Sequence, residues 1–375
     1  MIKVVVEMER LKVSSAVKAT PLELGFVERR NPNYRDSNFQ LDSRQWATSG
    51  FSLGRFLARY WCGDKALRED RSISRKRLAL VSAGIDNGDR EARRLRHQID
   101  LYLQAFRHVV NSAEISVNLV CQINKLVNQN HPQSGELRNK QNSIGDPRNP
   151  RYIPPRPEAV PALMCDLAEF ANDVSVHAMA KAITVHSQLL AIHPFCDGNG
   201  RTARVLMDGM IDKVNPDYVS LSLYRLRNEK SYLDALDQFG ITGNMGLRHR
   251  YWKEAFELSE SFKAEVDAII AHAECRLYSG LAAFDASDDL RLICKDLWQQ
   301  PIIPNSCLSL PAGWSDARFS AAIEKLVLAG VLELRDLKKP IGTQILSAPI
   351  IFQAWQQIDE LVFAHEQSFQ AGPLL

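Results

Sequence analysis

The chain has 375 residues and a formal net charge of only +2, because 46 Lys and Arg face 44 Asp and Glu. This balance excludes a general electrostatic attraction to nucleic acid, so any such binding has to be local. The seven cysteines form no C-x-x-C pair, and neither a secretory signal nor a run of roughly 20 apolar residues is present. We therefore expect a cytoplasmic protein of two or three domains, without a disulfide framework and without membrane contact.

The N-terminal region, residues 1–108, becomes regular only in its second half. Asn, Pro, Arg and Ser crowd RRNPNYRDSNFQLDS within residues 1–70, which indicates loop, and FSLGRFLARYW can form a short amphipathic helix. From Ser74 to about Val127, apolar residues at three- and four-residue steps predict helix. The charged run DREARRLRHQ is interpreted as a solvated helix face, with a nucleic-acid patch as the alternative.

Residues 128–161 interrupt this helical pattern. The segment is rich in Asn, Gly and Pro, which predicts loop, a short hairpin or both, and YIPPRP is alternatively a proline-rich ligand. Helical spacing returns over 159–172 and 175–192. Because the residue before Pro194 is disfavoured in the α region, we expect the second helix to end near His193.

The remaining chain is predicted to be mostly helical. A helix is expected to start at RTARVLMDGMID, and others at about 228–238 and 250–274. Beyond a joint near 279–289, helices over 289–299 and 315–328 precede two short strands, VLELRD and TQILSA. This order is the layout of a winged helix.

The stretch His193-Pro-Phe-Cys-Asp-Gly-Asn-Gly-Arg-Thr-Ala-Arg204 combines residue types suited to phosphate chemistry. A histidine has an unperturbed pKa near 6.5, so its neutral ring can act as a base at pH 7. Asp197 supplies a hard oxygen ligand of the kind that Mg²⁺ prefers. Phe195 is expected to anchor the loop in the core.

The glycines and arginines of this stretch suit an anion. Gly198 and Gly200 flank Asn199 and allow close backbone approach, while a following helix start favours negative charge. Arg201 and Arg204 lie three residues apart, near one side of a first helical turn, with guanidinium groups suited to phosphate oxygens. Each feature alone is usually structural, but their contiguity predicts a site.

Two other nucleotide motifs are excluded. Gly198-x-Gly200-x-x-Ala203 matches the dinucleotide fingerprint, which needs a hydrophobic strand directly before it, whereas HPFCD precedes it here. The chain contains no G-x-x-x-x-G-K-[ST] sequence, so a P-loop is absent.

The stretch resembles the Fic family signature H-x-F-x-[DE]-G-N-G-R-x-x-R at every fixed position. The resemblance covers about 109–270 and implies a mainly α fold, an all-helical core with a small β-hairpin flap. With the appended segment, it implies an N-terminal region 1–108, a Fic domain 109–274 and a winged-helix-like domain 285–375. Fic proteins typically transfer AMP from ATP to a Ser, Thr or Tyr hydroxyl of a protein target.

The resemblance also implies roles for individual residues. His193 corresponds to the base that deprotonates the target hydroxyl, and Asp197 to the residue that holds Mg²⁺ on the α- and β-phosphates. The remaining motif residues correspond to ATP contacts: an anion hole of Gly198, Asn199 and Gly200, a phosphate clamp at Arg201, and a γ-phosphate contact at Arg204. The segment from Gly135 to Gly145 corresponds to the flap, which would align the target by strand-like pairing at Ser143, Ile144 and Gly145.

An inhibitory segment is one interpretation of Ser82-Ala-Gly-Ile-Asp86-Asn87. It resembles the Fic motif [ST]-x-x-x-E-[GN], with Asp86 in place of Glu, so that its contact with Arg204 would be long, bridged by water or absent. An ordinary helix end at Asp-Asn-Gly is the other interpretation, and both stay open.

Three further questions stay open in the sequence. An inhibitory carboxylate that orients a water would favour removal of AMP instead of its transfer. A DNA-binding regulator that senses nucleotide is the alternative class, yet the helix 315–328 offers only Arg318 and Lys325 as cations, against Asp316 and Glu324. A protein contact or a homodimer is an equal expectation for the C-terminal domain.

Overall fold

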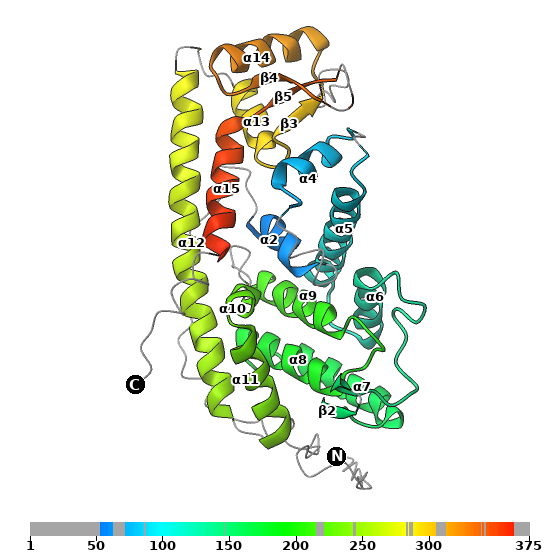
Figure 1. The fold of residues 1–375 in the computed structure, drawn as a ribbon. Coiled ribbons are helices and arrows are strands. Elements are labelled where there is room, and N and C mark those ends of the chain that lie inside the picture. The colour runs from blue at the N-terminus through cyan, green and yellow to red at the C-terminus, as the bar shows by residue number, and fades with distance from the viewer. Residues whose placement is uncertain are drawn as a thin grey trace. The chain divides into compact units, whose positions relative to one another are not determined.

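The computed structural model describes residues 53–62, 72–85, 88–146, 148–214, 221–242, 245–282, 284, 288–304, 313–338, 340 and 343–363. The fold is mainly helical with small antiparallel sheets (Figure 1), as the sequence predicts. The described residues form two compact units, one with Trp61, Cys62 and Asp100–Glu257, the other with 53–60, 72–99 and 258–363. None of the described helices combines the length and the apolar character that crossing a membrane requires. The domain limits drawn from the sequence remain a prediction.

The first unit is built around two adjacent helices, α8 (Ala178–Ile192) and α9 (Asn199–Asp212), which pack against each other (Figure 1). Most residues of each helix are buried, and the buried ones include polar residues such as His186 in α8 and Asp208 in α9. Their neighbours in the sequence are α6 (Val117–Val127), a short 3-10 helix (Pro157–Ala159), α7 (Val160–Asn172), α10 (Ser222–Arg227) and α11 (Glu229–Thr242). Helices α5 (Arg90–Asn111) and α12 (Met245–Leu281) contribute residues to both units.

One contact between helices α5 and α9 depends on a glycine. A Cβ atom added to Gly209 of α9 would lie 2.7 Å from the Cβ of Val109 on α5. Two helices can approach this closely only where one of them has no side chain, so Gly209 sets the spacing between α5 and α9.

The hairpin predicted within residues 128–161 is present. Strand β1 (Ile144–Asp146) pairs antiparallel with β2 (Asn149–Tyr152), in the register Gly145↔Pro150 and Asp146↔Asn149. The register shifts between Ile144 and Gly145, where Gly145 has a φ of 96°. A glycine with positive φ at such a bulge bends the strand locally without a steric penalty.

The second unit holds a three-stranded antiparallel sheet of order β3-β5-β4 (Figure 1). The strands are β3 (Ile302–Pro304), β4 (Glu333–Asp336) and β5 (Gln344–Ser347), and the helices are α2 (Leu53–Trp61), α4 (Arg75–Ser82), α13 (Asp288–Leu297), α14 (Asp316–Leu328) and α15 (Pro349–Phe363). The predicted helices at 289–299 and 315–328 and the two predicted strands are confirmed. Strand β3 was not expected, because three apolar residues ending in proline carry no periodicity.

Candidate active site

Helix α8 ends where the sequence predicts, at His193, which adopts the left-handed conformation with φ 49° and ψ 58°. Among the described residues, His193 is the one non-glycine residue with a positive φ. Its backbone N–H still donates to the Leu189 carbonyl at 2.9 Å, so it closes the last turn of α8. This conformation costs about 1–2 kcal/mol for an L-residue, and surrounding contacts must hold it in place.

The imidazole of His193 contacts the last turn of α8 through one of its ring nitrogens. Its Nδ1 lies 3.3 Å from the carbonyl oxygen of Leu190, and because a carbonyl only accepts, Nδ1 carries the proton in this contact. In the neutral ring, Nε2 therefore keeps its lone pair. Burial lowers the pKa of His193 to about 4, and the nearby charge of Arg138 acts in the same direction. The ring is thus neutral at pH 7 and able to accept a proton.

Asn199 closes the loop after His193. Its Oδ1 accepts from the backbone N–H of Phe195 at 3.0 Å, and its Nδ2 donates to the Phe195 carbonyl at 2.9 Å. Phe195 itself is fully buried, as the sequence predicts. The Asn199 side chain is thus occupied within the protein, and only its backbone N–H is left for the predicted anion hole.

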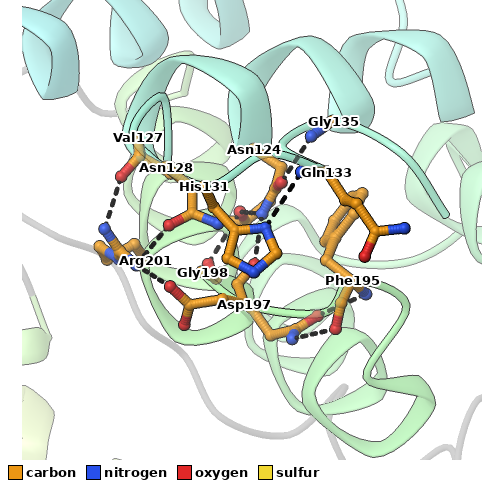
Figure 2. A network of polar contacts seen from close by, with 12 residues as sticks. Asn124, Val127, Asn128, His131, Gln133, Gly135, Phe195, Asp197, Gly198 and Arg201 are labelled. Carbon is orange, nitrogen blue, oxygen red and sulfur yellow. Dashed lines mark hydrogen bonds and ion pairs between the residues drawn. The ribbon is translucent and has the colours of Figure 1, made fainter. Parts of the chain in front are cut away.

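Asn124 on α6 joins three parts of the site (Figure 2). Its Nδ2 donates to the Asp197 carbonyl at 3.0 Å and to Thr202 Oγ1 at 3.1 Å, and its Oδ1 accepts from the Gly135 N–H at 2.8 Å. Its side chain is fully buried. Sequence reasoning missed this residue, although an asparagine on the apolar face of a predicted helix is the signal that could have found it.

Gly198 starts helix α9 in a conformation and a space that suit only glycine. Its φ is 80°, and an added Cβ would lie 2.9 Å from Asn124 Nδ2 and 3.0 Å from Asn128 Cβ. No side chain caps α9 at this end. The N–H groups of a first helical turn lack intrahelical partners, and the helix dipole adds positive potential there. The start of α9 can therefore bind an anion.

Arg201 is bound to the protein, which the motif alone does not predict. Its Nη1 donates to the Val127 carbonyl at 2.8 Å, and its Nη2 to Asn128 Oδ1 at 2.7 Å and Asp197 Oδ2 at 2.8 Å (Figure 2). The guanidinium thereby holds the end of α6 against the loop. Its expected function as a phosphate clamp remains a prediction.

Asp197 has an exposed carboxylate next to the start of α9. Its side chain is 56% exposed, and the ion pair with Arg201 uses Oδ2 and leaves Oδ1 open. Within the described part of the chain, no group of three or more His, Cys, Asp or Glu side chains could hold a metal. Mg²⁺ is commonly bound by one or two carboxylates together with substrate phosphates, and a single open carboxylate fits this pattern.

Arg204 belongs to α9 and lies just after its first turn. Its side chain is almost completely buried, and a Cβ added to Gly200 would be 3.3 Å from its Nη1. Its Nη2 donates to the Trp61 carbonyl at 3.4 Å. Gly200 thus leaves the space that the guanidinium occupies near the start of the helix.

The remaining predicted site residues lie in different places. Ile144 and Gly145 belong to β1 and Ser143 precedes it; Ser143 and Gly145 are exposed. Ser82 is the last residue of α4 in the second unit, and Asp86 lies outside the described residues. The flap and inhibitory assignments therefore stay predictions, whereas His193, Asp197 and the start of α9 share one loop.

Comparisons with known proteins identify the region that carries this loop. Residues 114–211 match the family model described as Fic/DOC family. The chain is 34% identical over 100 residues to "Protein adenylyltransferase fic-1" of Caenorhabditis briggsae, covering 25% of this chain and 19% of that protein. It is 28% identical over 151 residues to "Protein adenylyltransferase Fic" of Drosophila willistoni, covering 39% of this chain and 28% of that protein. The matched part therefore spans less than a third of these relatives.

Solved structures of Fic proteins are also similar. A Fic family protein from Desulfovibrio desulfuricans G20 superposes with a TM-score of 0.47 at 15% identity, covering 88% of this chain and 97% of that one. Fic-1 (residues 134–508) from Caenorhabditis elegans gives a TM-score of 0.45 at 22% identity, covering 65% of this chain and 72% of that one. From the family match, the complete signature and the loop that lies within the matched range, we conclude that residues 114–211 of this chain are a Fic/DOC family domain.

Proposed function

We propose that this protein is a protein adenylyltransferase that moves AMP from Mg-ATP to a Ser, Thr or Tyr hydroxyl of a protein target. One observation carries the proposal: a neutral imidazole at His193, an exposed carboxylate at Asp197 and the uncapped start of α9 lie on one loop of the Fic domain. The names of the similar worm and fly proteins support the same reaction class.

In the proposed reaction, Nε2 of His193 accepts the proton of the target hydroxyl while that oxygen attacks the α-phosphorus of ATP. The bond between the α-phosphorus and the oxygen that bridges to the β-phosphate breaks, so pyrophosphate leaves and the target carries an AMP ester. The proton then passes from His193 to solvent. The N–H groups at the start of α9, beside Gly198 and Gly200, stabilise the charge on the phosphates.

Two side chains would complete the nucleotide contacts. Asp197 Oδ1 would hold Mg²⁺, which neutralises phosphate charge when it is bound. Arg204 would meet the γ-phosphate, and its guanidinium would then exchange the Trp61 carbonyl for a phosphate oxygen, which is the stronger acceptor. The protein target would pair along β1, which pairs only with β2 among the described strands.

The proposal is tested by incubating the full chain with ATP labelled at the α-phosphate, followed by mass measurement of every labelled protein. We expect a mass increase that matches AMP for the wild type and no label for His193→Ala. Because the imidazole acts only on the proton, His193→Ala should bind ATP as the wild type does. Label that persists in His193→Ala would contradict the proposal. An adduct of another mass would indicate that a molecule other than ATP is the donor.

The C-terminal unit gives less support to the alternative of a DNA-binding regulator. The strand order β3-β5-β4 beside α13 and α14 supports a winged-helix assignment. Arg318, one of the two cations of α14, is however bound by both carboxylate oxygens of Asp289, at 2.8 and 2.5 Å. We therefore propose a protein contact for this unit, and binding of duplex DNA by the full chain with a steep salt dependence would contradict it.

A further inference from the structure

The two ends of the β1–β2 hairpin are bound to the end of α8 through one buried arginine, Arg138. The last carbonyls of a helix have no intrahelical partners and need donors from elsewhere. Here the Arg138 side chain donates to two of them, from Nε to the His193 carbonyl at 2.8 Å and from Nη2 to the Ile192 carbonyl at 3.3 Å. The backbone N–H of Arg138 adds a bond to the Pro194 carbonyl at 2.8 Å.

The same guanidinium also binds the chain on both sides of the hairpin. Its Nη1 donates to the Lys140 carbonyl at 3.1 Å, before β1, and its Nη2 donates to the Pro155 carbonyl, after β2. The Arg138 side chain is only 3% exposed. One rigid planar group therefore connects the entry of the hairpin, its exit and the residue that carries the imidazole.

Two further side chains, one in β2 and one just before β1, donate to neighbouring carbonyls at and just beyond the end of α8. The hydroxyl of Tyr152, in β2, donates to the Ala191 carbonyl at 2.8 Å. Asn142, just before β1, donates from Nδ2 to the Phe195 carbonyl at 3.1 Å. Together with the bonds of Arg138, these contacts give each carbonyl of residues 191–195 a donor from residues 138–152. The Phe195 carbonyl accepts from Asn199 as well.

A buried guanidinium among carbonyls is a costly way to fill space. Desolvation of a charge costs several kcal/mol unless other groups compensate, and here the compensation comes from carbonyl dipoles at the negative end of α8. An apolar side chain of similar size would avoid this desolvation cost, but it would leave the carbonyls of Ile192 and His193 without the donor that Arg138 supplies. The arrangement gains instead a fixed geometry, since the fork of Arg138 meets its acceptors only when β1 and His193 stand in one relative position.

We propose that Arg138 is a positioning residue that sets the placement of β1 relative to the imidazole of His193, with Tyr152 as its second contact. The inference rests on the proposed function, in which the target pairs along β1 while Nε2 of His193 takes its proton. Arg138 touches neither the target nor the nucleotide. Its loss should therefore impair transfer to a protein hydroxyl more than binding of ATP or transfer of AMP to water.

The test compares four full-length proteins: wild type, Arg138→Lys, Tyr152→Phe and Tyr224→Phe. Lysine keeps the charge of Arg138 but cannot reach carbonyls on opposite sides of the hairpin. Tyr152→Phe removes only one hydroxyl and protects the test against a variant that does not fold. Tyr224→Phe is the matched control, because it also removes a hydroxyl with a single partner, here the Glu254 carboxylate, far from the flap in the sequence.

Three quantities are measured for each protein: AMP attached to the chain itself per AMP released to water, the Kd for ATP, and amide hydrogen exchange of residues 136–155. For Arg138→Lys we expect the ratio to fall on the order of tenfold to a hundredfold, the cost of misplacing reacting groups by about 1 Å. For Tyr152→Phe we expect the same ratio to fall about fivefold, because one hydrogen bond contributes about 1 kcal/mol. In both Arg138→Lys and Tyr152→Phe, amide exchange should be faster in β1 and β2, and the Kd for ATP should not change. Tyr224→Phe should match the wild type in all three quantities.

The outcomes separate the two proposals. An unchanged ratio and unchanged exchange in both flap variants would overturn the positioning role of Arg138 even if the wild type transfers AMP. Faster exchange throughout the first unit, with parallel loss of ATP binding, would show a general structural contribution and would also overturn it. A wild type that neither binds ATP nor releases AMP would refute the proposed function, and the exchange data would still decide whether Arg138 holds the hairpin.

Discussion

Replacing Gly198 by alanine perturbs the start of α9 in two ways that can be separated. The φ of 80° is a conformation that residues with a Cβ rarely adopt. The added Cβ would also lie 2.9 Å from Asn124 Nδ2 and 3.0 Å from Asn128 Cβ and Cγ. Asn124 cannot move away easily, because it binds the Asp197 carbonyl, Thr202 and Gly135.

The loss of unfolding free energy expected for Gly198→Ala has two contributions. The left-handed backbone costs about 1–2 kcal/mol for a non-glycine residue. Overpacking against buried side chains adds about 1–3 kcal/mol. Gly330→Ala is the matched control, because Gly330 has a φ of 69° and no atom lies within 4 Å of its added Cβ. This variant has the cost of the left-handed backbone without the cost of overpacking. Gly198→Ala should therefore lower the free energy of unfolding by about 1–3 kcal/mol more than Gly330→Ala.

The assay is urea unfolding of the full chain, with each free energy taken from the transition of the unit that carries the substitution. ATP affinity is measured in parallel. We expect Gly198→Ala to weaken ATP binding at least about tenfold, because about 1.4 kcal/mol of misplaced N–H contacts suffices, and Gly330→Ala to leave it unchanged. Equal losses of stability in the two variants, or unchanged ATP binding by Gly198→Ala, would refute this account of the α9 start.

Three other predictions follow from close packing and burial. Gly209→Ala should cost about 1–3 kcal/mol by collision with Val109. Urea unfolding should show a smaller cost of Gly209→Ala in a Val109→Gly background, because glycine removes the Cβ and Cγ atoms that the added Cβ would meet; an equal cost in both backgrounds would mean that the two helices meet elsewhere. Since the pKa of His193 lies at about 4, the base stays neutral as pH falls, so the labelling rate should hold from pH 7.5 to 5.5; a midpoint near 6.5 would contradict its burial. Burial also lowers the pKa of His186 to about 3. As pH falls below about 6.5, both rings take up a proton in the unfolded chain but stay neutral in the folded one, so the free energy of unfolding measured with urea should decrease, by about 2 kcal/mol per ring at pH 5. A free energy of unfolding that does not vary with pH in His186→Gln would contradict the contribution of His193.

Much of the local structure is determined by short-range rules that the sequence displays. Pro194 restricts the residue before it, so the end of α8 at His193 was predictable. The order of histidine, carboxylate, glycines and arginines within twelve residues predicts that this loop binds an anion, and Gly-, Asn- and Pro-rich sequence predicted the hairpin segment. These features depend on neighbours a few residues apart, and a linear pattern contains that information.

Only the tertiary structure decided which polar groups are occupied by the protein itself. Asn124 binds the Asp197 carbonyl across 73 residues of sequence, and Arg138 binds the His193 carbonyl across 55. Side chains that the motif assigns to phosphate, on Asn199 and Arg201, are likewise bound within the protein. Such contacts arise when helices pack and bring unpaired carbonyls next to distant donors, and because every buried carbonyl accepts from any donor that reaches it, no local pattern specifies the partner.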